Sequence, residues 1–81
     1  MANHINPNSI NYKLGQNLAR IRKKNGLSQA DMEDYLISRS YYGKIELGLF
    51  SVTVDKLFLI SRAFGCPIKD LFIDENGKPI L

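Results

Sequence analysis

Few side chains in this sequence have the types and spacing that catalysis or metal binding requires. His4 is the only histidine, and no cluster of other metal ligands surrounds it. Asp31, Glu33 and Asp34 lie together in one short segment, but no histidine or nucleophile accompanies them in a catalytic pattern. The sequence also lacks a glycine-rich loop of the kind that cradles phosphate. These residues therefore predict a protein that is not an enzyme and that uses no metal and no cofactor.

Basic side chains are the more informative group. Lys13, Arg20, Arg22, Lys23 and Lys24 follow one another with no acidic residue among them, although the net charge of the whole chain is only +3. On spacing alone, a solvated helix face is the favoured interpretation of such a run. The other interpretation is a surface that attracts phosphate groups.

The size and composition of the chain fit one small cytoplasmic domain. Its 81 residues are 44% hydrophobic and 23% charged, which argues against disorder of the chain as a whole. The single cysteine cannot form an internal disulfide, which is typical of a reducing compartment. No apolar run is long enough to cross a membrane, and no signal peptide is recognisable at the start.

Hydrophobic periodicity predicts five short helices that would position these side chains. We expect a flexible arm over residues 1–11, a helical domain over 12–72 and a C-terminal tail over 73–81. Stop and cap signals divide the domain: Asn25-Gly26, the pair Ser28 and Asp31, Ser38, Gly48, Thr53 (or Ser51), Gly65 and Pro67. Apolar stripes are expected at Leu14, Leu18 and Ile21; at Met32, Tyr35 and Leu36; at Tyr41, Tyr42 and Ile45; at Val54, Leu57, Leu59 or Ile60, Ala63 and Phe64; and at Ile68, Leu71 and Phe72.

The tail carries the strand signal of the sequence. Asn76-Gly77 lies between short apolar ends, which favours a hairpin, whereas Pro79 weakens that signal. The predicted fold class is therefore all-α, with a possible short β tail.

Three runs together resemble a known family. "LGQNLARIRKKNGLSQADM", "SRSYYGKIELG" and "VDKLFLISRAFGCPIKDLF" cover residues 14–72 and resemble the Cro/repressor-type (XRE) helix-turn-helix domain. The resemblance implies a compact five-helix repressor-like domain that binds double-stranded DNA. One short helix would cross the phosphate backbone, and the next would enter the major groove.

The resemblance also implies roles for particular residues. Base contacts would come from Arg39, Ser40 and Lys44, and phosphate contacts from Gln29, Ser28, Tyr41 and Lys24. Arg22 and Glu46 would form a partly buried salt bridge between the first and third helices, although two solvated surface charges are the alternative. A homodimer interface is expected at Phe64, Ile68, Leu71 and Phe72.

The sequence departs from the family pattern around the helix-turn-helix. Glu33 replaces a small inner-face residue, and the chain is one residue short before Ser38, where the family usually places a turn glycine. Tyr42 replaces a buried aliphatic residue, and Gly43 follows it within the expected recognition helix. Together these changes indicate a concerted repacking in which the second helix ends near Tyr35.

We therefore predict a transcriptional regulator that binds a near-palindromic operator as a homodimer. A controller protein of a restriction-modification system or of a mobile element is a subtype of this prediction. The alternative is a helix-turn-helix scaffold used for protein binding, such as an antirepressor or antitoxin-like module. The apolar loop residues Leu47, Leu49 and Phe50 would supply that partner surface, unless Phe50 folds back as additional core.

Overall fold

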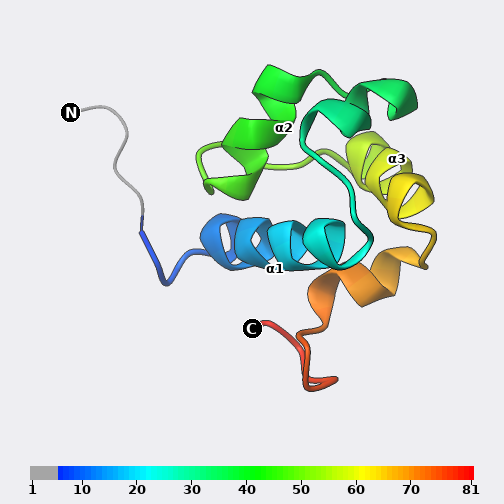
Figure 1. Cartoon of the computed structure of the whole chain (residues 1–81). Helices are drawn as coiled ribbons and strands as arrows, with labels where there is room; N and C mark the ends of the chain where they lie inside the picture. Colours follow the sequence, from blue (N-terminus) through cyan, green and yellow to red (C-terminus); the bar gives the residue numbers. More distant parts are fainter. Residues whose placement is uncertain (1–5) are drawn as a thin grey trace.

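The structure, a computed structural model, describes residues 6–81 and is helical over most of that range (Figure 1). Its elements are the α-helices α1 (Ile10–Lys24), α2 (Arg39–Glu46) and α3 (Val54–Phe64), and the 3-10 helices η1 (Ala30–Tyr35) and η2 (Ile68–Phe72). The all-α fold class is confirmed, and the second and fifth predicted helices are 3-10 helices. Residues 1–5 of the predicted arm lie outside the described range.

α1 begins earlier than the sequence predicts. The hydroxyl of Ser9 accepts a hydrogen bond from the backbone N–H of Tyr12 at 3.1 Å and so caps the helix from inside the expected arm. At the other end, the side chain of Asn25 donates to the carbonyl of Ile21 at 2.8 Å, and Gly26 adopts φ +72°. With Ser9 as its cap, α1 begins at Ile10, inside the segment 1–11 that the sequence predicts as an arm.

One hydrophobic core holds the helices together. α1 packs against α2 and η2, and α3 packs against η1 and η2. Figure 1 shows α1 below α2, with α3 beside them. The core consists of Leu14, Leu18, Ile21, Met32, Ile37, Tyr42, Ile45, Ile60, Phe64 and Leu71.

α1 and α2 approach each other closely at Gly15. A Cβ atom at this position would lie 2.4 Å from the carbonyl oxygen of Ile45 and 2.6 Å from that of Glu46. Any larger residue would therefore push the two helices apart. This contact fixes α2 against the first helix.

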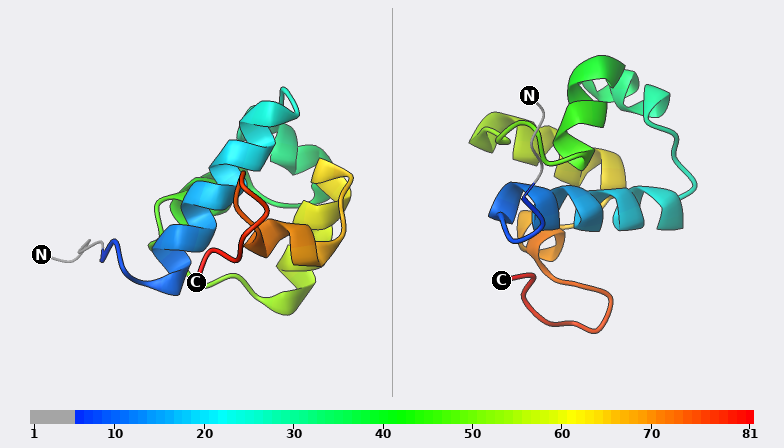
Figure 2. Two further views of the ribbon diagram at one scale, coloured as in Figure 1. Left: turned by 90° about the horizontal axis from the view of Figure 1, so that it is seen from below. Right: turned by 90° about the vertical axis from the view of Figure 1, so that its left-hand side faces the viewer.

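The C-terminal tail folds back along α1 (Figure 2). Its β character is a single antiparallel bridge between Ile73 and Pro79. Asn17, which is buried in α1, donates to the carbonyls of Leu71 at 2.7 Å and Ile73 at 2.9 Å. Arg20 adds a bond to the carbonyl of Ile73 at 3.1 Å. Within residues 6–81, no helix is long and apolar enough to span a bilayer.

Candidate nucleic-acid interface

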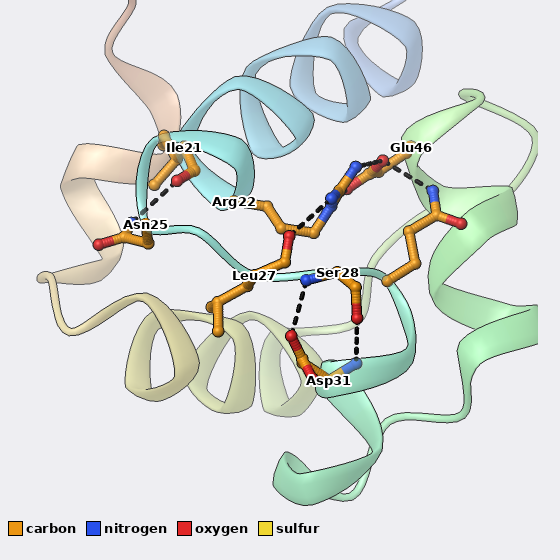
Figure 3. Close-up of polar contacts among 8 residues, drawn as sticks. Ile21, Arg22, Asn25, Leu27, Ser28, Asp31 and Glu46 are labelled. Carbon is orange, nitrogen blue, oxygen red and sulfur yellow. Dashed lines mark hydrogen bonds and ion pairs between the residues drawn. The ribbon is translucent and has the colours of Figure 1, made fainter.

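The segment that leads into the interface begins with a capping box. The backbone N–H of Ser28 donates to the carboxylate of Asp31 at 2.7 Å, and the N–H of Asp31 donates to the hydroxyl of Ser28 at 3.1 Å (Figure 3). The predicted pairing of these two residues is confirmed. η1 follows directly, with Met32 buried against the core.

The turn between η1 and α2 uses a leucine where the family pattern favours glycine. Leu36 adopts φ +67° and ψ +27°, and it is the one non-glycine residue with positive φ in the described part of the chain. Its side chain is 80% exposed, whereas Ile37 is buried. The prediction that Leu36 belongs to an apolar stripe is therefore wrong. The backbone must reverse at residue 36, which turns the leucine outward and makes Ile37 the core residue.

The 3-10 conformation of η1 explains how the turn can be one residue short. A 3-10 helix rises about 2.0 Å per residue, compared with about 1.5 Å in an α-helix. The six residues of η1 therefore span roughly the length of eight α-helical residues. The shorter segment still reaches α2, although its hydrogen bonds are poorer than those of an α-helix.

Two acceptors secure the N-terminus of α2. The hydroxyl of Ser38 accepts from the N–H of Tyr41 at 3.2 Å, and the carboxylate of Glu33 accepts from the N–H of Arg39 at 3.3 Å. Glu33 is exposed. The acidic residue at the family's small inner-face position therefore points outward and caps the next helix, which the sequence pattern alone did not reveal.

α2 separates a buried face from an exposed one. Tyr42 and Ile45 point into the core, whereas Arg39, Ser40 and Lys44 are all exposed. The structure brings these three predicted base-contacting residues together along one shallow groove. Gln29, Glu33, Gly43 and Leu47 complete the lining of that groove.

Arg22 and Glu46 form a bidentate ion pair between α1 and α2. Nε of Arg22 donates to one carboxylate oxygen at 2.7 Å, and Nη2 donates to the other at 3.0 Å (Figure 3). Nη1 of Arg22 donates to the carbonyl of Leu27 at 2.8 Å, so the pair also holds the loop before η1. The two side chains are only 10% and 7% exposed, which excludes the alternative of two solvated charges.

The pair is charged because its hydrogen bonds outweigh its burial. Burial disfavours the carboxylate of Glu46, but hydrogen bonds from Arg22 and Gln29 hold its pKa below the ordinary value. The hydrogen bonds to Glu46 likewise raise the pKa of Arg22. Both groups are therefore ionised at neutral pH and anchor α2 with charge-assisted bonds.

Tyr42 lies beside this pair without a hydrogen bond of its own. Its side chain is fully buried, and its hydroxyl is the one buried side-chain polar atom of residues 6–81 with no partner. Burial, reinforced by the nearby carboxylate of Glu46, raises the pKa of Tyr42 far above the ordinary value for tyrosine. The larger side chain thus fills the space of an aliphatic residue and leaves a polar group unsatisfied.

Gln29 connects the ion pair to the exposed surface. Its Nε2 donates to Glu46 at 2.8 Å, and its amide lies across Gly43. A Cβ atom at Gly43 would lie 3.3 Å from Oε1 of Gln29. Gly43 therefore leaves room for the side chain of Gln29, a packing role that the sequence did not predict. The one signal for it is the presence of a glycine in the interior of a short helix, one turn before Glu46.

A second groove runs along the basic side of α1. Its lining includes Lys13, Gln16 and Lys23 of α1 together with Gln29 and Gly43. Asp74 and Glu75 of the tail also contribute to the lining. The predicted phosphate contacts Ser28 and Lys24 are exposed nearby in the chain, on the loop and at the end of α1, but they do not line either groove.

Tyr41 and Lys44 of α2 form a small cluster with Phe50, which lies in the loop after the helix. The rings of Tyr41 and Phe50 have centroids 5.8 Å apart, and Nζ of Lys44 lies 5.4 Å from the centroid of Phe50. Tyr41 is half-buried by this packing, whereas Phe50 and Leu47 remain exposed and Leu49 is half-buried. Phe50 therefore does not belong to the core, but it packs against Tyr41 and Lys44 of α2.

Two of the four predicted dimer residues are not available to a partner. Phe64 is 5% exposed and Leu71 is 0% exposed, because both complete the monomer core between α3, η2 and α1. That part of the prediction is wrong, whereas Ile68 and Phe72 are half-buried. Apolar periodicity identified these residues as buried but could not show which surface buries them.

The fold and this surface define a helix-turn-helix protein. A sequence profile described as helix-turn-helix matches residues 18–71. The chain belongs to this family, of the Cro/repressor (XRE) type, and is a DNA-binding transcription regulator.

Two solved structures are similar in both sequence and fold. The restriction-modification controller protein C.AhdI from Aeromonas hydrophila is 31% identical, with a TM-score of 0.73 over 75% of this chain and 94% of that one. The DNA-binding domain of BldD is 30% identical, with a TM-score of 0.67 over 75% of this chain and 90% of that one. No curated protein matches the sequence.

Proposed function

We propose that this protein recognises a specific duplex DNA sequence through α2, as a homodimer on a near-palindromic operator. The observation that carries the proposal is the placement of Arg39, Ser40 and Lys44 on the exposed face of a rigidly anchored helix. An α-helix fits the major groove, where arginine and lysine pair well with guanine O6 and N7. Serine is permissive, so Ser40 would discriminate between bases less than Arg39 and Lys44.

The phosphate contacts follow from donors that the fold leaves unused. Gln29 gives one amide hydrogen to Glu46 and retains a second for a phosphate oxygen. The hydroxyl of Ser28 accepts from Asp31 and therefore keeps its own proton to donate. Lys24 and Tyr41 would add further contacts at either side, and these interactions position the helix without reading sequence.

A homodimer would present two copies of α2 to successive major grooves, about 34 Å apart. Ile68 and Phe72 remain candidates for the interface, since Phe64 and Leu71 are needed in the core. The basic side chains of α1 would attract DNA nonspecifically, and binding should weaken steeply as salt rises.

Selection from a randomised duplex library near physiological salt tests the proposal. Sequencing of the retained DNA should reveal a two-fold-symmetric site. Retention without enrichment would show that α2 does not read bases, and an enriched site without symmetry would contradict the homodimer. The Gln29→Ala variant should retain less DNA of every sequence, whereas Lys44→Ala should retain a broader set of sequences.

The similarity to C.AhdI favours a restriction-modification controller as one form of this regulator. The selected site should then occur beside restriction or methyltransferase genes in the source genome. A second function, protein binding by the loop after α2, is favoured by the exposure of Leu47 and Phe50. Leu49 would contribute less because it is half-buried. Failure of the library selection would leave that loop as the surface to test.

A further inference from the structure

One face of α3 is apolar, exposed and unused by the regulator described so far. Val54 is 67% exposed and Phe58 is 56% exposed, and they lie one turn apart on the helix. The opposite face of α3 is buried through Ile60 and Phe64. Together Val54 and Phe58 form a small contiguous apolar patch, which is the kind of surface that a partner can cover.

Two charged residues accompany this pair. Asp55 lies in the first turn of α3 and Arg62 in the last. At about 100° per residue, Val54, Phe58, Arg62 and Asp55 fall within an arc of about 100° on the helix surface. Both charged residues are exposed, and the single ion pair among the described residues is that of Arg22 and Glu46.

The local explanation for these charges is the helix dipole, which favours an acid at the N-terminus and a base at the C-terminus. Thr53 also donates a hydrogen bond to Asp55. Neither explanation accounts for the two exposed apolar residues, Val54 beside Asp55 and Phe58 between the two charges. The arrangement as a whole, with an acid at one end, a phenylalanine near the middle and a base at the other end, is complementary to itself in the antiparallel direction.

We propose that α3 is the homodimer interface and pairs antiparallel with α3 of a second copy, with Phe58 against Phe58 of the partner subunit. The proposal rests on the homodimer proposed above and names its surface. Asp55 and Arg62 are seven residues apart, and Phe58 lies close to the midpoint between them. A two-fold axis at that midpoint places Asp55 opposite Arg62 of the partner subunit.

Symmetry repeats this contact, so the interface contains two identical ion pairs. The two helices touch along a line that runs through Phe58 of each subunit. A two-fold axis perpendicular to the plane of the two helices places a residue that lies on one side of this line next to partner residues on the same side. Asp55 and Arg62 lie on the same side of the line through Phe58, so the two pairs can form at once. A parallel arrangement would instead set Asp55 against Asp55 of the partner subunit. The charge pattern therefore selects the antiparallel pair and favours a second copy over an unrelated protein.

Charge reversal tests this geometry directly. The Asp55→Arg variant would have two bases on the face, and the Arg62→Asp variant would have two acids, so each should dimerise at least about tenfold more weakly than the wild type. An equimolar mixture of these two variants should recover a one-to-one heterodimer, as should the doubly reversed variant with itself. Sedimentation at low ionic strength measures all four samples, and circular dichroism checks that each remains folded.

Two further variants complete the experiment. Phe58→Ser should weaken every dimer, whereas Glu75→Arg, the same kind of charge reversal on the exposed tail, should have no effect. A dimer that ignores the reversals at positions 55 and 62 would overturn the proposed interface and leave the DNA-binding homodimer standing. A protein that is monomeric both alone and on its selected DNA would overturn the α3 interface and the homodimer together. Enrichment of a single half-site in that case would show that the protein still recognises a DNA sequence.

Discussion

Replacement of Leu36 by glycine should stabilise the protein or leave it unchanged, although it removes a large apolar side chain. The leucine has a left-handed backbone conformation, which costs an L-amino acid roughly 1–2 kcal/mol. Its side chain is 80% exposed, so about a fifth of the roughly 1.5–3 kcal/mol of a fully buried leucine would be lost. Glycine also gives the unfolded chain more freedom, which opposes folding by roughly 0.5–1 kcal/mol.

These terms nearly cancel, so the sharper quantity is the comparison between two variants. Leu36→Gly and Leu36→Ala lose the same contacts, but only alanine retains a Cβ atom at positive φ. We expect the glycine variant to be more stable than the alanine variant by roughly 0.5–1 kcal/mol, which is the cost of the left-handed conformation less the greater freedom of glycine in the unfolded chain. For a domain of this size, the difference corresponds to roughly 2–8 °C in Tm.

Leu47 provides the matched control. It is also an exposed leucine near the end of a helix, but its φ is −80°. There the order should reverse, with Leu47→Gly less stable than Leu47→Ala by about 0.5–1 kcal/mol. Thermal and urea denaturation, followed by circular dichroism, measure both pairs. An alanine variant at position 36 that matches or exceeds the glycine variant would refute the argument that the turn is strained.

Four other expectations concern the ion pair, its neighbour and the exposed face. Arg22→Ala should destabilise the protein by about 3–5 kcal/mol in urea denaturation because it leaves Glu46 buried and unpaired, whereas Lys23→Ala should have little effect. An Arg22→Ala variant with unchanged stability would contradict the role of the pair. Because the pKa of Glu46 is lower in the folded state, its contribution to stability is fully present at neutral pH and is lost as the pH falls through the folded-state pKa. The Glu46→Gln variant should lack this acid sensitivity in the same assay. Tyr42→Phe should preserve stability or increase it by up to about 1 kcal/mol, since the hydroxyl has no partner, and a clear loss would imply a hydrogen bond to the neighbouring carboxylate of Glu46 or to a water. Lys44→Ala should change base preference in competition binding with single-base variants of the selected site, and an equal loss for all of them would assign Lys44 to phosphate.

Sequence patterns predicted the parts of the fold that depend on local chemistry. The caps at Ser28 and Ser38 and the stop at Gly65 are all present. The ion pair of Arg22 and Glu46, expected from the family resemblance, is present with bidentate geometry. These features depend on residue type and short spacing, which a sequence displays directly.

Features that depend on tertiary geometry could not be predicted. The missing turn residue was visible, but the sequence could not show that η1 would lengthen as a 3-10 helix or that Leu36 would adopt positive φ. Periodicity also placed Val54 on the apolar stripe of its helix, and Phe64 was expected at the dimer interface, whereas the structure exposes Val54 and buries Phe64 in the monomer core. Periodicity indicates which apolar side chains of a helix lie on one face. Whether that face packs in the core of the monomer or lies on its surface depends on the packing of the whole domain.

The shortened entry to α2 also determines how this chain must be compared with its relatives. Ser38 fixes where the helix starts, and Glu46 fixes its rotation through Arg22. Any gap in an alignment therefore belongs at Leu36, outside the helix. A gap placed one turn later would shift every outward-facing residue by one position, or about 100° around the helix axis. Operator specificities inferred from such an alignment would assign to Arg39 the bases read by Ser40. A comparison of base-contacting residues across the family therefore requires the backbone conformation of the turn as well as the sequence of the helix.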